Sequence, residues 1–156
     1  MDNDPLIGKK LANYKVERLL GRGGMANVYL GEDVALHRPV AIKVIDERYR
    51  GDVDYAQRFI SEARAVATWR HENVIHVYYA GKQEGSYFFV MEYIDGMDLS
   101  ALIDTYAKDD ELMPHDDVIS IGSAVASALD YAHAEGVIHR DVKPANVMIA
   151  YDDRVV

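Results

Sequence analysis

The sequence predicts an α+β fold in two parts: a five-stranded antiparallel sheet with one helix, followed by a mainly helical region. Three observations carry this prediction. Residues 14–45 read as strand, glycine-rich turn, strand, turn and strand, with no helical stretch between them. Residues 74–94 hold two further strand-like runs. Residues 54–70 and 114–135 instead repeat apolar side chains at helical spacing.

Composition excludes several classes of protein. The 156 residues suit one domain or two small lobes, and a net charge of −9 argues against a nucleic-acid-binding surface. The absence of cysteine excludes disulfides and thiolate metal sites. No run approaches the roughly 18 apolar residues of a membrane helix, so no membrane segment is predicted.

The glycine-rich stretch GRGGMA at 21–26 matches the pattern G-x-G-x-x-G/A. A dinucleotide-binding turn would open a helix there. Val28 and Tyr29 favour a strand instead, after a half-polar strand at 14–20. A turn at Leu36–Pro39 and an apolar strand complete an antiparallel meander, so the dinucleotide-binding interpretation fails.

The middle of the chain predicts one helix and two strands. Phe59, Ala63 and Val66 share a face of the helix at 54–70. Strands at 74–82 and 86–94 follow, joined through Glu84-Gly85, and Asp95-Gly96 is predicted to form a turn.

The last third predicts helices and then a loop. Asp98 is a candidate N-cap for a short helix, Pro114 suits the first turn of the longer helix, and Gly136 suits its end. The residues after Gly136 predict a loop, a short strand and a turn at Asp152-Asp153.

Residues 139–146 read HRDVKPAN, which resembles the protein-kinase catalytic loop H-R-D-x-x-x-x-N. The hairpin at 21–26, VAIK at 40–43, a helix with Glu62 and a hinge after Met91 precede it in the family's order. The chain is thus identified as a member of the eukaryotic-like protein kinase family.

The sequence also resembles one class within that family. Lys143 and Pro144 are similar to the Ser/Thr class, and GRGGMANVYLGED looks most like the bacterial Ser/Thr kinases. The implied fold is a kinase-like N-lobe followed by an incomplete, mainly helical C-lobe. The predicted divisions are an N-terminal extension (1–13), the N-lobe (14–94), a hinge or linker (95–97) and a partial C-lobe through the catalytic loop (98–156).

The resemblance implies a role for each catalytic residue. Asp141 is the expected base that accepts the substrate hydroxyl's proton, and Lys143 faces the γ-phosphate. Lys43 pairs with phosphates and with Glu62. Asn146 is the expected Mg²⁺ ligand, while the second ligand, the aspartate of D-F-G, is absent from the chain.

The implied cofactors are ATP and Mg²⁺. The hairpin glycines let backbone N–H groups approach phosphates, and Ala26 replaces the family's third glycine, so we expect a slightly stiffer but usable loop. The resemblance implies that the following residues bind ATP: Leu20, Gly21, Gly23, Gly24, Ala26, Val28, Ala41, Lys43, Met91, Glu92, Ile94, Asp98 and Met148.

Two functions remain open. The first is an ATP-dependent protein serine/threonine kinase, of which this chain, ending at Val156, is expected to be a truncated and weakly active or inactive portion. The second is a non-catalytic nucleotide-binding or regulatory module that keeps the fold.

The sequence further suggests partners and a location. The expected partner is a protein substrate with Ser or Thr, and self-association is expected through the uncovered apolar face of 114–135. The expected location is cytoplasmic, with membrane anchorage open for a longer parent.

Overall fold

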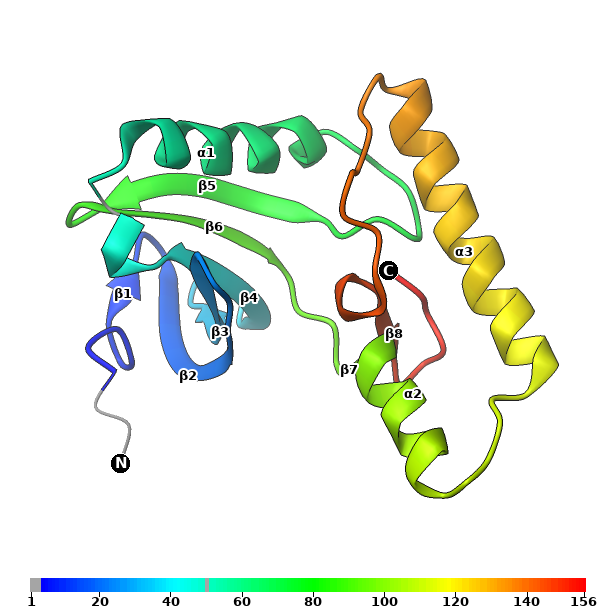
Figure 1. The fold of residues 1–156 in the computed structure, drawn as a ribbon. Coiled ribbons are helices and arrows are strands. Elements are labelled where there is room, and N and C mark those ends of the chain that lie inside the picture. Colours follow the sequence, from blue (N-terminus) through cyan, green and yellow to red (C-terminus); the bar gives the residue numbers. More distant parts are fainter. Residues whose placement is uncertain (1–3, 50) are drawn as a thin grey trace. The chain divides into compact units, whose positions relative to one another are not determined.

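The computed structural model of the chain describes residues 4–49 and 51–156 (Figure 1). Residues 1–3 of the predicted N-terminal extension lie outside the described residues. The described part of that extension contacts the second strand, where the N–H of Gly8 donates to the carbonyl of Val16 at 2.8 Å.

The chain forms two compact units. The first comprises the described residues up to Trp69 together with His76–Tyr93. The second comprises Arg70–Ile75 and Ile94–Val156. The second unit therefore includes a short segment, Arg70–Ile75, that precedes the last two strands of the first unit in the sequence. The predicted division assigns that segment to the N-lobe (14–94).

The first unit is built on a six-stranded antiparallel sheet in the order β1-β2-β3-β4-β6-β5. The five strands that the sequence predicts are all present, and a sixth strand, β1, adds two residues of the N-terminal extension. The strands are β1 (Lys10–Leu11), β2 (Tyr14–Arg22), β3 (Ala26–Asp33), β4 (Arg38–Ile45), β5 (Val77–Gln83) and β6 (Ser86–Glu92).

The turns between these strands follow local chemistry. The turn after β3 spans residues 34–37, because the buried carboxylate of Asp33 accepts the N–H groups of Ala35 and Leu36. The predicted turn at Leu36–Pro39 is therefore two residues too late, and Arg38 begins β4. The predicted turn at Glu84-Gly85 is confirmed, and both residues have positive φ, as a tight hairpin requires.

Helix α1 (Val53–Ala67) follows the short 3₁₀ helix η1 (Glu47–Tyr49) and ends three residues before the predicted end. Asp52 caps it by accepting the N–H of Tyr55 at 2.9 Å. Phe59 and Ala63 are buried, as their helical spacing predicts, and the Phe59 ring lies 4.9 Å from that of Phe89 on β6. The helix packs along β5 and β6 in Figure 1.

The two edges of the sheet are joined by the side chain of Gln83 at the end of β5. Its Oε1 accepts the N–H of Ala12 at 2.7 Å, and its Nε2 donates to the carbonyl of Lys10 at 3.0 Å. Leu11 is buried in the same core cluster as Phe88. The sheet therefore curls until its first and last strands meet.

The second unit contains two helices and a two-stranded ribbon. Its elements are β7 (Gly96–Asp98), α2 (Leu99–Lys108), α3 (His115–Ala134), η2 (Pro144–Asn146) and β8 (Met148–Ala150). Asp98 caps α2 by accepting the N–H of Ala101 at 2.9 Å, as predicted. Pro114 stands just before α3 as its N-cap, and Gly136 follows it with φ of +79°.

The predicted turn at Asp95-Gly96 is wrong, because Gly96 begins β7. Gly96 pairs with Ala150 in β8, and a Cβ placed on it would collide with the carbonyl oxygen of Ile149. The glycine is thus needed for close approach of two strands rather than for a turn. The predicted linker at 95–97 accordingly carries the first two residues of β7.

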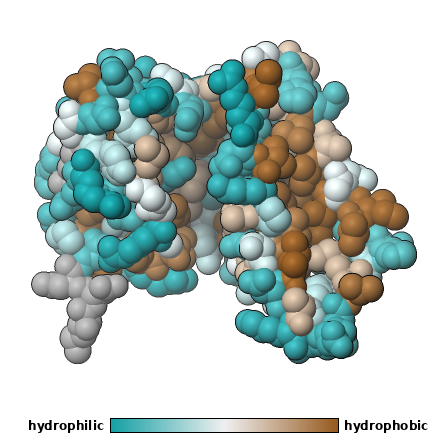
Figure 2. All heavy atoms as spheres, viewed as in Figure 1, coloured by the Kyte–Doolittle hydropathy of each residue, from teal (hydrophilic) through white to brown (hydrophobic). Residues whose placement is uncertain are grey.

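Helix α3 leaves much of its apolar side uncovered by the described residues. Ala132 is the buried residue of this helix, while Val118 and Ile119 are exposed. Hydrophobic side chains gather over α3 in Figure 2. A groove of about 510 Å³ lies among α2, α3 and the loop before η2, with Ile103, Val118, Ile121 and Val142 in its lining. No helix formed by the described residues is long and apolar enough to cross a membrane.

Candidate active site

The glycine-rich hairpin joins β2 to β3 in the first unit. The N–H of Gly23 donates to the carbonyl of Ala26 at 2.9 Å, which closes the turn. A Cβ on Gly23 would stand 2.8 Å from that carbonyl oxygen, so a side chain here would force a shift. Gly21 and Gly24 instead have open space where a Cβ would lie. The hairpin thus keeps three backbone positions free of side chains, two of which face open space.

Ala26, which replaces the family's third glycine, is part of the hydrophobic core. It is buried in a cluster with Ile45, Phe59 and Phe89. Its methyl group therefore contributes to the core beneath α1.

Strand register places several predicted ATP-binding residues on one face of the sheet. Val28 pairs with Lys43, which pairs in turn with Phe89. One row further along, Ala41 pairs with Met91. Side chains of paired residues stand on the same side of a sheet, so Val28, Ala41, Lys43 and Met91 share one face. Lys43 is half-buried, and its Nζ lies 5.6 Å from the centre of the Phe89 ring.

The expected pair between Lys43 and Glu62 is not formed. Glu62 is exposed on α1, and no ion pair joins it to Lys43 among the described residues. The structure thus places both residues in the first unit without bringing their charges into contact.

The residues expected around the adenine fall into both units. In the first, Glu92 ends β6 with its N–H donated to the carbonyl of His76, and Leu20 is exposed on β2. In the second, Ile94 is buried, while β7 and β8 set Asp98 opposite Met148. The cap that Asp98 gives α2 uses one carboxylate oxygen.

The catalytic-loop sequence brings three predicted residues together in the second unit. Lys143 Nζ lies 2.9 Å from Asp141 Oδ2. Asn146 Nδ2 donates to the same oxygen at 3.0 Å and to the Asp141 backbone carbonyl at 2.8 Å. The 3₁₀ turn η2 makes this geometry, because it folds Asn146 back over a separation of five residues.

These contacts lower the pKa of Asp141 and hold its carboxylate in place. Hydrogen bonding from Lys143, and then from Asn146, lowers the pKa of the exposed Asp141 carboxyl below its ordinary value. The carboxylate is ionised at neutral pH, as it would be at its ordinary pKa, and the two contacts make it a weaker base that is held in place as a hydrogen-bond acceptor. Arg140, just before it, has φ of +64°, an uncommon conformation for a residue with a side chain.

Residues 14–156 match the family described as "Protein kinase domain". The chain belongs to the protein kinase family. It is similar to "Serine/threonine-protein kinase PrkC" of Bacillus subtilis, with 39% identity over 145 residues, and to "Probable serine/threonine-protein kinase PknB" of Lactococcus lactis, with 42% over 146. Each alignment covers 92% of this chain but only 22% and 23% of the relative.

Solved structures agree with this membership and with the predicted fold class. The Mycobacterium tuberculosis PknI kinase domain matches with a TM-score of 0.80 and 34% identity, over 95% of this chain and 59% of that one. "PpkA-294 apo form" matches with a TM-score of 0.84 at 23% identity, over 96% and 58%, and supports the fold alone. The two curated relatives are named as bacterial serine/threonine-protein kinases, and this protein-kinase-family chain is similar to them.

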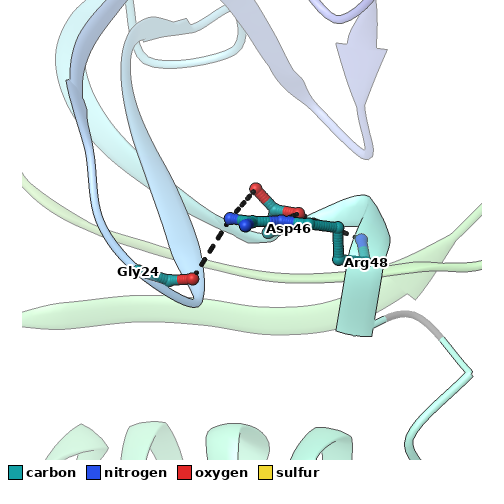
Figure 3. A network of polar contacts seen from close by, with 3 residues as sticks. All are labelled: Gly24, Asp46 and Arg48. Carbon is teal, nitrogen blue, oxygen red and sulfur yellow. Dashed lines mark hydrogen bonds and ion pairs between the residues drawn. The ribbon is translucent and has the colours of Figure 1, made fainter.

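A polar network at the hairpin tip was not predicted from the sequence. Arg48 of η1 donates to the carbonyl of Gly24 and to both carboxylate oxygens of Asp46 (Figure 3). The signal available in the sequence was a carboxylate and an arginine two residues apart, directly after the strand that pairs with the hairpin. Nothing in that spacing identifies Gly24 as the third partner.

Proposed function

We propose that this chain is part of an ATP-dependent protein serine/threonine kinase that transfers the γ-phosphate of Mg-ATP to a Ser or Thr hydroxyl. The observation that carries the proposal is the cluster of Asp141, Lys143 and Asn146, whose side-chain contacts lie within about 3 Å. Kinase chemistry depends mainly on positioning and on charge stabilisation. This cluster supplies a carboxylate, a cation and an amide at one place.

Each residue of the cluster has a proposed part in the transfer. The oxygen of the substrate hydroxyl forms a bond to the γ-phosphorus, and the hydroxyl proton passes to Asp141. The bond between the γ-phosphorus and the oxygen that bridges the β- and γ-phosphates breaks, which releases ADP. Lys143 offsets the negative charge of the transferred group. Lys43 and the hairpin N–H groups bind phosphate oxygens. Glu62, which makes no ion pair with Lys43 in the part of the chain that the structure describes, would orient Lys43 once the two side chains are paired.

The residues present fit Mg²⁺ that binds together with phosphate. No group of three or more His, Cys, Asp or Glu side chains in the described part of the chain is arranged to hold a metal ion. Mg²⁺ commonly takes only one or two protein oxygens, with phosphate and water completing its shell. The amide oxygen of Asn146 is the proposed protein ligand, and the bound ion would neutralise charge on the phosphates.

A second candidate is a non-catalytic nucleotide-binding or regulatory module. The observation that favours it is the lack of contact between Lys43 and Glu62, two residues that must be paired for transfer in protein kinases.

One experiment separates the two candidates. We would measure ³²P transfer from Mg-[γ-³²P]ATP to a basic protein and to the chain itself, beside Asp141→Asn, together with ATP binding by calorimetry. The kinase proposal expects transfer that Asp141→Asn lowers by about 10²-fold or more. Binding without transfer, both by this chain and by a longer polypeptide that includes the D-F-G aspartate, would support the second candidate. Neither binding nor transfer by the folded chain would overturn both.

A further inference from the structure

The tip of the glycine-rich hairpin is attached to the segment that follows β4. Arg48 Nη2 donates to the carbonyl oxygen of Gly24 at 3.2 Å (Figure 3). The backbone N–H of Asp46 donates to the carbonyl oxygen of Met25 at 3.0 Å. Two consecutive carbonyl groups of the tip are thus held by residues outside the hairpin.

Holding a carbonyl also fixes the N–H of the same peptide unit. A trans peptide is planar, and its C=O and N–H point in opposite directions. The bond to Gly24 therefore orients the N–H of Met25, and the bond to Met25 orients the N–H of Ala26. Both N–H groups point away from the segment that carries Asp46 and Arg48.

Arg48 is itself held in place by Asp46. Its Nε and Nη2 donate to Asp46 Oδ1 and Oδ2 at 2.8 and 3.2 Å, and its backbone N–H donates to Oδ1 at 3.0 Å. Only a guanidinium can make this fork and still reach a third acceptor. We call the hydrogen bonds from Arg48 to Asp46 and to the Gly24 carbonyl the tie. Because the carboxylate of Asp46 balances the charge of Arg48, the tie adds no net charge to the hairpin.

We infer that Arg48 is a positioning residue for nucleotide binding, which orients the N–H groups of the hairpin tip by anchoring the Gly24 carbonyl through its fork with Asp46. This inference rests on the proposed function, because it assigns a purpose to the hairpin's phosphate-binding geometry. Gly24 has no side chain that could hold the tip, and a Cβ there would meet open space. An external anchor is therefore the means by which a bare glycine tip keeps one conformation.

The first arm of the test needs no nucleotide. Hydrogen exchange of the Asp46 and Gly23 N–H groups is measured by NMR in the wild-type chain, Arg48→Lys and Arg48→Met. Loss of the hydrogen bonds between Arg48 and Asp46 is expected to raise both exchange rates about threefold in each variant. A change of this size corresponds to the small free energy that an exposed ion pair contributes. Arg18→Lys on β2, which changes another exposed arginine, is the matched control and should exchange like wild type.

The second arm measures Mg-ATP affinity by calorimetry. Arg48→Lys and Arg48→Met should each raise the dissociation constant about threefold, and Arg18→Lys should not. Asp46→Asn combined with Arg48→Met should cost no more than Arg48→Met alone, because both act through one tie.

The outcomes separate the inference from the proposed function. Unchanged exchange in the Arg48 variants would show that the tie does not hold the tip, and the inference would be wrong. Faster exchange with unchanged affinity would also overturn it, while ATP binding by wild type would leave the proposed function standing. If the wild-type chain bound no ATP, both would fall, even where the exchange arm detected the tie.

Discussion

Asp141 owes its lowered pKa mainly to one neighbour, Lys143. Both side chains are more than half exposed, so their ion pair adds little to folding stability. The pair instead fixes the direction of a carboxylate that the proposed mechanism requires. At the scale of single residues, function and stability can therefore be changed separately in this loop.

Replacing Lys143 with Met should raise the pKa of Asp141 toward its ordinary value, because the largest cause of its depression is removed. Asn146→Ala should produce a smaller rise. NMR titration of the Asp141 carboxyl carbon measures both effects. Lys108→Met, an exposed change on α2, is the control and should leave the titration of Asp141 unchanged. An unaltered Asp141 titration in Lys143→Met would contradict the contact itself.

At the scale of elements, the β7–β8 ribbon shows how a single glycine sets a pairing. Asp98 and Met148 come from segments 50 residues apart and lie opposite each other only because Gly96 and Ala150 can approach closely. A side chain on Gly96 would have to displace backbone atoms, which are harder to move than a flexible side chain.

Gly96→Ala should therefore destabilise the chain by about 1–3 kcal/mol, the usual cost of forcing extra atoms into a packed site. Gly122→Ala on α3 is a matched control, because a Cβ there meets nothing within 4 Å. That change should instead stabilise the helix by about 0.5–1 kcal/mol. Denaturant unfolding followed by circular dichroism compares the two. Equal effects of the same sign would refute the role given to Gly96.

Elements with long periodic patterns were predictable, and elements defined by distant partners were not. The spacing of Phe59 and Ala63 predicted α1, and the eight letters at 139–146 placed Asp141 and Asn146 in one loop without predicting that they would contact each other. By contrast, β1 has only two residues, and Asp95-Gly96 has the composition of a turn although its partner strand makes it β7. The strands that pair with β1 and β7 cannot be predicted from the residues of β1 and β7 alone.

The candidate site was predictable in type but not in every contact. Strand alternation could place Lys43 on one face, yet whether α1 brings Glu62 to it depends on how the helix packs. The Arg48 anchor at Gly24 spans 24 residues and depends on the register of β3 with β4. Contacts of this kind follow from packing, which periodicity does not encode.

At the scale of the whole molecule, the groove beside α3 is an apolar surface open to solvent in the described chain. Exposed apolar surfaces of this kind favour association between copies. We therefore expect the sedimentation-equilibrium mass of the chain to rise with concentration.

Val118→Glu should weaken this association about tenfold, because it puts a charge into the groove. Ile119→Glu is the matched control, since Ile119 is more exposed and lies outside the groove lining. Equal behaviour of the two variants would show that the groove is not the contact surface. A constant monomer mass for wild type would refute the expected association.

The hydrogen bonds by which Gln83 joins the two edges of the sheet also have a consequence for the order of folding. The hairpins β2–β3, β3–β4 and β5–β6 join neighbours in the chain, so each can close early at small entropic cost. The bonds from Gln83 to Lys10 and Ala12 join residues 73 and 71 positions apart and require the curled sheet to exist already. These hydrogen bonds should therefore be among the last contacts to form and among the first to break when the sheet opens.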